Sequence, residues 1–163
     1  VGMSYLGQKI LYHILNSRPG VLAERVFAPW PDFEQALISE DYPLFSLENR
    51  IPLSEFDILG FSLLYELNYS NILTMLKLGG IPFRSAERAS WHPLVAAGGP
   101  AAFNPEPVAD VFDFFVIGDG EEAFPEIVAS LRRLSPYWDA GKNQPRPEGL
   151  AMLEQTEMPQ AQT

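Results

Sequence analysis

The sequence predicts an α/β fold with a doubly wound parallel sheet. Short segments that are apolar throughout alternate along the chain with amphipathic segments of helical period, a pattern typical of strands that helices cover on both faces. Gly, Ser and acidic residues follow directly after several of these apolar segments, where sheets of this class bind ligands. A doubly wound domain normally begins with a strand, but the first periodic segment here is a helix. We therefore expect a sheet that lacks its first strand.

The expected strands are the short apolar segments. They occupy residues 22–28, 57–62, 94–97 and 113–117, and a weaker extended piece covers 44–47. Prolines and glycines separate these segments from their neighbours, which indicates turns.

Four amphipathic segments predict the helices. The first covers about residues 3–17, and the second runs from its expected cap, Asp32, to residue 39. The third covers 68–78 and closes at Gly79-Gly80, which suits a C-terminal cap, and the fourth covers 121–134. The side chains expected to be buried on the last two helices are Tyr69, Ile72, Leu73, Leu76, Phe124, Ile127, Val128 and Leu131.

The length suits one domain followed by a tail. A chain of 163 residues with 47% hydrophobic content can bury one sizeable core. We place that domain at residues 1–134 and regard it as truncated at its N-terminus, because the first strand is missing. Residues 135–163 contain prolines among Gln, Glu and Gly with few large apolar side chains, and we expect them to form a flexible tail.

The composition excludes several classes of function. The formal net charge is −10, from 21 acidic against 11 basic side chains, so a nucleic acid would be repelled. No segment approaches the roughly 20 apolar residues that cross a bilayer, and no leader peptide is visible. We therefore expect a soluble, cytoplasmic protein. The chain has no cysteine, which excludes disulfides and a thiolate-held iron–sulfur cluster.

One loop has the layout of a phosphate-binding loop. Gly118-Asp119-Gly120-Glu121-Glu122 follows a predicted strand and opens a helix. A phosphate needs free backbone N–H groups at the positive end of the helix dipole, but three carboxylates stand there. No Lys followed by Ser or Thr completes a P-loop. We therefore expect a helix start or a docking surface at this loop rather than an anion site.

Three stretches carry a family resemblance: VGMSYLGQKILYHILNSRPGVLAERVFAPWPDFE, FDILGFSLLYELNYSNILTML and LVAAGGPAAFNPEPVADVFDFFVIGDGEE. In this order they resemble the N-terminal, cobalamin-binding-like domain of an uncharacterised family of radical S-adenosylmethionine proteins, over about residues 1–134 and no further. The resemblance implies a flavodoxin-like, Rossmann-like fold. It also implies a catalytic radical S-adenosylmethionine barrel downstream in the same polypeptide, which would carry the iron–sulfur cluster and the S-adenosylmethionine.

The resemblance further implies a set of cofactor-binding residues. Cobalamin-binding domains of this type have Ser-x-Leu after the third strand and Gly-Gly after the fourth, and an acidic Gly-x-Gly-Glu after the fifth is common in cobalamin-type radical enzymes. Each motif also has a plain structural explanation: a small residue at a strand end, a turn, or a carboxylate that complements a helix dipole. The matching positions are Ser62, Leu64, Gly98, Gly99, Gly118, Gly120 and Glu121.

The departures from the family pattern concern the metal centres. A histidine that ligates cobalt would stand in Asp-x-His-x-x-Gly after the first strand, and neither His13 nor His92 has that context. The Cys-x-x-x-Cys-x-x-Cys motif that holds a radical-enzyme cluster is also missing. We expect the chain by itself not to be catalytic, and to be a fragment, an excised domain or a truncated reading frame of a radical S-adenosylmethionine enzyme.

Two hypotheses of different class follow. In the first, the chain is an accessory domain that binds, or derives from one that bound, a cobalamin-like cofactor and that docks the catalytic barrel. In the second, it is a protein-interaction module of Rossmann-like fold without a small ligand. In a flavodoxin-like order the strands at 22–28 and 57–62 are the neighbours of the missing strand, and they either pair with each other or leave backbone donors and acceptors open. Open edges recruit partners, so we also expect self-association or marginal stability.

Overall fold

The computed structural model describes residues 6–139, and its fold is α/β. Three parallel strands form one sheet in the order β1-β2-β3: β1 is Ile58–Ser62, β2 is Leu94–Gly98 and β3 is Phe114–Val116. The predicted strands at 57–62, 94–97 and 113–117 are thus confirmed to within about a residue at each end. The sheet fits the predicted class, and the predictions for residues 1–5 and 140–163 lie outside the described part of the chain.

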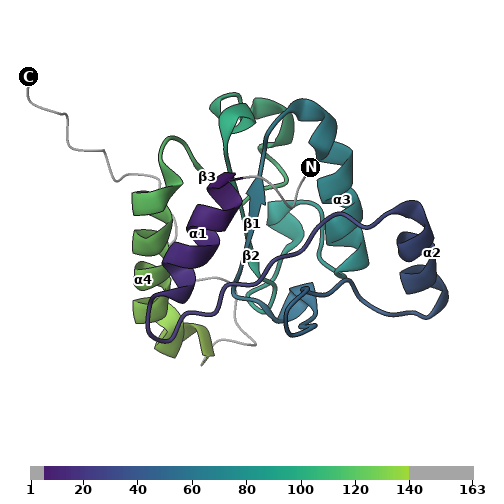
Figure 1. Ribbon diagram of the computed structural model, residues 1–163, viewed down its shortest axis with the longest axis horizontal. Helices are drawn as coiled ribbons and strands as arrows, with labels where there is room; N and C mark the ends of the chain where they lie inside the picture. Colours follow the sequence, from purple (N-terminus) through teal and green to yellow (C-terminus); the bar gives the residue numbers. More distant parts are fainter. Residues whose placement is uncertain (1–5, 140–163) are drawn as a thin grey trace, which may run out of the picture.

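Helices lie on both sides of this sheet. In Figure 1 it stands between α1 with α4 on one side and α3 on the other, and α2 lies beyond α3, which it contacts. The α-helices are α1, Leu6–Asn16; α2, Pro31–Ser39; α3, Tyr69–Leu78; and α4, Gly120–Asp139. Short 3-10 helices are η2, Leu53–Glu55; η3, Glu66–Asn68; η4, Ser85–Glu87; η5, Pro100–Phe103; and η6, Glu106–Val108.

The expected strand at 22–28 is not a strand. Its backbone belongs to no ladder of the sheet, because among the described residues no strand lies beside it to share hydrogen bonds. The weak extended piece at 44–47 contributes a single antiparallel bridge between Phe45 and Pro52. An extended conformation follows from local sequence, but a strand also needs a partner.

Two helix boundaries differ from expectation. The residue before α2 is Trp30, with Pro31 in the first turn, so Asp32 lies inside the helix and does not cap it. Pro at this position needs no N–H partner, which makes it a good helix start. The last helix continues to Asp139, so residues 135–139 of the expected tail are helical.

The predicted cap of α3 is confirmed. Gly80 has φ 67°, the left-handed conformation that glycine adopts at low cost, and its N–H donates to the Lys77 carbonyl at 3.1 Å. Ile81 N–H donates to the Leu76 carbonyl at 2.9 Å. One buried side chain was predicted wrongly, because Leu73 is 37% exposed while Met75 takes the inward position.

The two faces of the sheet are packed differently. On the α3 side, Leu59 and Val95 are buried in one cluster with Ile72, Met75 and Leu76 of that helix. On the α1 and α4 side the strands present small residues in register, Gly60 beside Ala96 and Ser62 beside Gly98. Of the helical side chains above them, Phe124 reaches the strand backbone, since a β-carbon added at Gly60 would lie 3.4 Å from its ring. The side chains of Phe124, Ile127, Val128 and Leu131 are half-buried rather than buried as expected.

A buried ion pair fixes the amino end of the sheet. The Arg88 guanidinium lies 3.1 Å from the Asp113 carboxylate and donates to the carbonyls of Pro82 at 3.1 Å and Val111 at 2.7 Å. Asp113 also accepts from Val95 N–H at 2.7 Å. These bonds tie the segment after α3 to the starts of β2 and β3, at the end of the sheet opposite the candidate site.

Candidate functional site

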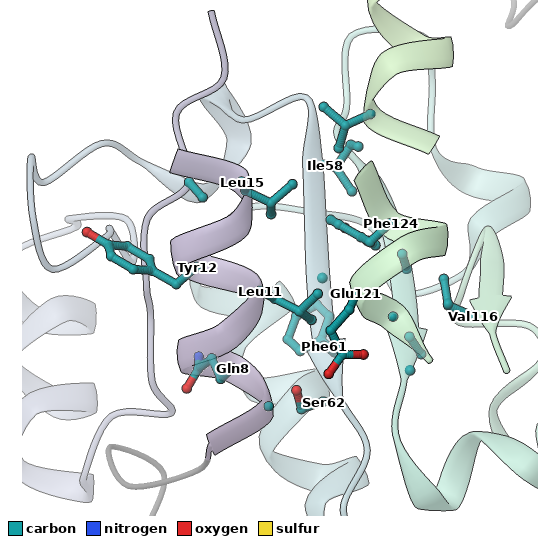
Figure 2. A pocket seen from close by; sticks show the side chains of 18 of the residues that line it. Gln8, Leu11, Tyr12, Leu15, Ile58, Phe61, Ser62, Val116, Glu121 and Phe124 are labelled. Atoms are coloured by element: carbon teal, nitrogen blue, oxygen red, sulfur yellow. The ribbon is translucent and has the colours of Figure 1, made fainter. Parts of the chain in front are cut away.

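A large cavity lies between the sheet and the pair α1 and α4. Its volume is about 810 Å³, enough for a drug-sized ligand. The small residues Gly60, Ser62, Ala96 and Gly98 line it from the strands, and their short side chains fill little of the space under the helices. Figure 2 shows apolar side chains of both helices around it; the labelled ones are Leu11, Leu15 and Phe124.

Most of the predicted cofactor-binding residues meet at this cavity. Ser62 and the glycine pair stand at the carboxyl ends of β1 and β2, and the Gly-x-Gly-Glu loop leads from β3 into α4. Leu64 is the exception, because it lines a second cavity of about 260 Å³ around β1. That these residues hold a ligand stays a prediction. The six that line the larger cavity are Ser62, Gly98, Gly99, Gly118, Gly120 and Glu121.

The conformation of Gly99 is required by the protein's own packing. Its φ is 100°, and a β-carbon added there would lie 3.0 Å from the Leu63 carbonyl oxygen. The Leu63 N–H donates to the Gly98 carbonyl at 2.7 Å, and the Leu63 carbonyl accepts from Ala101 N–H at 2.9 Å. The Gly-Gly motif thus lets the backbones after β1 and β2 approach each other, which is the plain structural explanation.

The start of α4 places acidic groups on the cavity wall. Gly118 has φ 104° with open space around its missing β-carbon, and Asp119 and Glu121 both line the cavity. Figure 2 shows the Glu121 carboxylate and the Ser62 hydroxyl reaching into the same part of it. The carboxylates complement the helix dipole and make this end of the cavity unfavourable for a phosphate.

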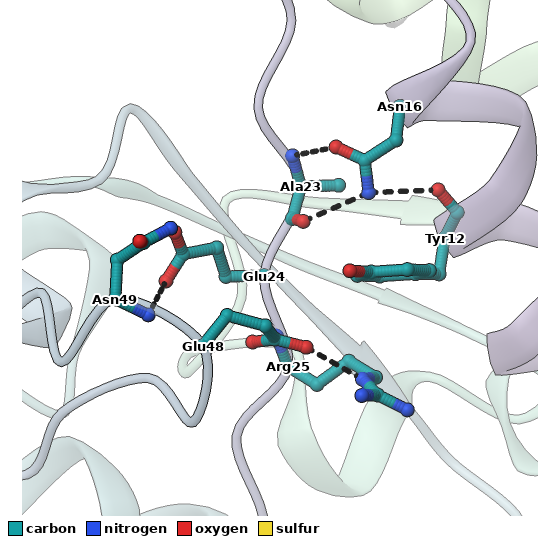
Figure 3. A network of polar contacts seen from close by, with 7 residues as sticks. All are labelled: Tyr12, Asn16, Ala23, Glu24, Arg25, Glu48 and Asn49. Carbon is teal, nitrogen blue, oxygen red and sulfur yellow. Dashed lines mark hydrogen bonds and ion pairs between the residues drawn. The ribbon is translucent and has the colours of Figure 1, made fainter.

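A polar network holds the segment beside the cavity in an extended conformation (Figure 3). The Asn16 side chain donates to the Ala23 carbonyl and accepts from the Ala23 N–H, both at 3.0 Å. The Arg25 N–H and its guanidinium both donate to the Glu48 carboxylate, at 2.8 and 2.7 Å. The guanidinium also lies 4.9 Å from the centre of the Tyr12 ring. These side chains take the place of a neighbouring strand on one edge of the segment.

Two groups of this network have shifted pKa values. Partial burial raises the pKa of Glu24, but hydrogen bonds from the Asn49 side chain, Ser46 and the Asn49 backbone outweigh it, so the net pKa lies below the ordinary 4.5. The hydrogen bond to Glu48 raises the pKa of Arg25. The network therefore keeps both charges at neutral pH.

Sequence reasoning missed the helical wall of the cavity and the polar network. The helical spacing of Leu11, Phe124 and Val128 predicts core packing, and the same spacing fits a cavity wall equally well. Arg25 and Glu48 lie 23 positions apart and form no motif, so no local signal could have paired them.

No histidine reaches the cavity from the described residues. His13 is exposed on α1 and does not line the cavity. His92 precedes β2, and its Nδ1 accepts from Ala89 N–H at 2.9 Å. Among the side chains that the structure describes, no three from His, Asp or Glu cluster as metal ligands would.

Large apolar side chains are exposed on the loops at the carboxyl ends of the strands. Leu67 is 81% exposed after β1, and Phe103 is 70% exposed after β2. Tyr65 and Ile117, on the loops after β1 and β3, are each half-exposed. We call these four residues the apolar rim.

Comparison with known families gives one match. The family described as "Radical SAM proteins, N-terminal" matches residues 7–158, so the similarity runs well beyond residue 134, where we expected it to end. Comparisons with curated proteins and with solved structures give no match. In the described part of the chain, every helix is too short or too polar to cross a membrane.

Proposed function

Because the chain belongs to the family of N-terminal domains of radical SAM proteins, we propose that it is an accessory domain with two tasks. Its apolar rim docks a catalytic radical SAM domain that belongs to the same polypeptide. Its cavity holds the nucleotide tail of a cobalamin-like cofactor at that interface. The catalytic domain contributes the iron–sulfur cluster and S-adenosylmethionine, for which this cysteine-free chain has no thiolate ligands.

The apolar rim is the observation that carries the docking proposal. Leu67 and Phe103 expose most of their surface, and they stand on loops from two neighbouring strands. Water-exposed apolar groups gathered at one edge of a domain are typical of a surface that a partner covers. The edge concerned is where α/β sheets bind their ligands, so a domain docked there would also close the cavity mouth.

The shape of the cavity supports the cofactor proposal in part. Ser62, Gly98 and the open space at Gly118 leave room at the carboxyl ends of the strands, and apolar helix side chains face that room. This combination suits the flat, apolar base of a nucleotide tail. A cobalamin bound by its tail would supply organocobalt chemistry to the neighbouring catalytic domain.

The ligand-free interaction module stays the second candidate. The observations that favour it are the acidic Asp119 and Glu121 on the cavity wall and the lack of a cavity-lining histidine among the described residues. The two carboxylates disfavour the phosphodiester of a nucleotide tail. Without a histidine at the cavity, the described residues offer no imidazole to ligate the cobalt. Under this alternative the rim keeps its docking role.

Docking is tested by binding the chain to its catalytic domain, produced separately. We expect Leu67→Asp and Phe103→Asp each to weaken the complex at least tenfold in a calorimetric titration. Ile38→Asp is the matched control, because Ile38 is also exposed, at 56%, but lies on α2 away from the rim. Rim variants that bind as tightly as the control would refute the docking surface.

Cofactor holding is tested by titrating the chain with cobalamin and following its visible absorption. We expect a spectral change that Ser62→Leu removes, because a larger side chain would enter the cavity from the end of β1. Ser54→Leu is the control, since Ser54 is exposed on η2 and lines neither cavity. An unchanged spectrum for the unsubstituted chain would leave the interaction module as the function.

A further inference from the structure

A gap separates residues 22–28 from the outer edge of β1. Both cavities are lined by Glu24 and Arg25 on one side and by Ile58, Gly60 and Ser62 on the other. The larger one opens toward α1 and α4, and the smaller reaches Ile72 and Met75 of α3. The hollow therefore passes from one face of the sheet to the other, which is the space that a strand would occupy.

The edge of β1 that faces this gap has free backbone groups. The Asp57 carbonyl accepts from Leu94 N–H at 2.9 Å, and Leu63 N–H donates to Gly98 at 2.7 Å, so the odd-numbered residues of this stretch bond to β2. In a parallel ladder the alternate residues point the other way. The backbone groups of Ile58, Gly60 and Ser62 thus face the gap, and within residues 6–139 nothing hydrogen-bonds to them.

The opposite side of the gap has the same pattern. Ala23 bonds through both backbone groups to the Asn16 side chain, and Arg25 bonds to Glu48 and, at 2.9 Å, to Leu47 N–H. Glu24 follows Ala23 and Val26 follows Arg25, and the backbone groups of Glu24 and Val26 have no hydrogen bond from the described residues. Extended backbone alternates direction at each residue, so these groups are directed toward the gap.

The two sides also run in the same direction. In Figure 2, α1 passes β1 with Gln8 at the level of Ser62 and Leu15 at the level of Ile58, so it runs opposite to the strand. The chain then turns, and 22–28 return in the direction of β1. A parallel strand between the two would find bonding partners on both edges.

We propose that this gap is the seat of one further parallel strand, supplied by the stretch of polypeptide that runs directly into α1. Because α1 begins at the carboxyl end of β1, a strand that ends there continues into α1 through a short connection. The unit strand–α1–residues 22–28 then forms the usual crossover between adjacent parallel strands. Residues 22–28 become a true strand once it is in place, which gives the sheet five strands.

The side chains of the strand follow from its surroundings. Helices cover both faces of the sheet at this point, α1 and α4 on one and α3 on the other, so the strand is apolar on both faces. It would fill the flank of the large cavity beside Gly60. Gly98 belongs to β2, and Gly118 and Glu121 follow β3, so these cavity-lining residues are not on the edge of β1 that faces the gap, and this inference does not depend on cofactor binding.

The test uses two fusions to the start of the chain. One carries about seven alternating valine and isoleucine residues, the usual length of a strand, joined through residues 1–5 to α1. The matched control has proline at every second position of the same segment, because proline lacks the N–H that a ladder needs. Amide hydrogen exchange of Val26, Gly60 and Ser62 is compared in both fusions and in the unfused chain, with Val95, already bonded to Asp113 at 2.7 Å, as the reference.

We expect the valine–isoleucine fusion to slow exchange of Val26 and Gly60 at least tenfold, and the proline fusion to leave it as fast as in the unfused chain. Equal exchange in the two fusions would overturn the proposal. If neither fusion folds, the unfused chain decides. In the monomeric unfused chain, fast exchange of the Val26 and Gly60 amides with slow exchange of the Val95 amide supports an open gap. Slow exchange of the Val26, Gly60 and Val95 amides refutes it.

Discussion

Gly99 and Gly118 both line the candidate site, but their backbone conformations are constrained in different ways. Their φ angles are nearly equal, 100° and 104°, so any other residue is strained at either position. Only Gly99 has a close neighbour, because an added β-carbon would lie 3.0 Å from the Leu63 carbonyl oxygen. Strain alone acts at Gly118, whereas strain and a backbone clash act together at Gly99.

We predict that Gly99→Ala lowers the free energy of unfolding by about 3 kcal/mol, toward the upper end for a strained backbone position. Gly118→Ala should cost only about 1 kcal/mol. Urea unfolding of the two variants and the unsubstituted chain measures both values. Equal costs would show that the approach of Leu63 to Gly99 is not a tight constraint.

Arg88 joins the segments at the amino end of the sheet through its ion pair and hydrogen bonds. Its guanidinium is buried, and Asp113 is its charged partner. We predict that Arg88→Ala lowers the free energy of unfolding by about 3–5 kcal/mol, because it removes one partner of a buried ion pair together with the donors to the Pro82 and Val111 carbonyls. Arg84→Ala serves as control, since Arg84 is exposed and its loss should cost less than about 0.5 kcal/mol. Chemical denaturation checks both, and a mild effect of Arg88→Ala would contradict the prediction.

At the scale of elements, residues 22–28 show what local sequence can and cannot determine. Their apolar, extended character is predicted from the sequence, yet they form no strand because no described residues pair with them on the β1 side. Side chains of Asn16 and Glu48 hold one edge in its place. Those bonds join residues far apart in sequence, so hydrophobic periodicity could not predict them.

The same network gives stability a dependence on pH. The pKa of Glu24 is lowered in the folded chain, so its contribution is present above the ordinary pKa of 4.5 and is lost as the pH falls through the lower folded value. We predict that the free energy of unfolding falls less between pH 5 and about pH 3 in Glu24→Gln than in the unsubstituted chain. Urea unfolding at several pH values measures the slopes.

Glu87→Gln is the control for this pH series. Glu87 is exposed on η4 and has no part in the network around Glu24. Its variant should retain the pH dependence of the unsubstituted chain. A Glu24→Gln variant with the same acid slope as Glu87→Gln would show that the bonds from Asn49 do not stabilise the fold.

At the scale of the whole molecule, the sequence predicted the parallel sheet and the place of the candidate site. Strands β1, β2 and β3 were found because strands covered on both faces are apolar throughout. The cavity was not predicted, because the small residues that line it from two strands, Gly60 and Ser62 beside Ala96 and Gly98, come into register only in the fold.

The open gap beside β1 leads to the last prediction, which concerns the 163-residue chain as a whole. The backbone groups of Ile58, Gly60 and Ser62, which have no hydrogen-bond partner among the described residues, form an edge that another chain can pair with. We therefore predict self-association, seen as a sedimentation coefficient that rises with concentration. The valine–isoleucine fusion should abolish it, because the added strand covers the edge, and the proline fusion should not. A chain that stays monomeric at all concentrations, while the amide of Gly60 exchanges fast, would show that the edge is open but too short or too recessed between α1 and residues 22–28 for a second molecule to reach.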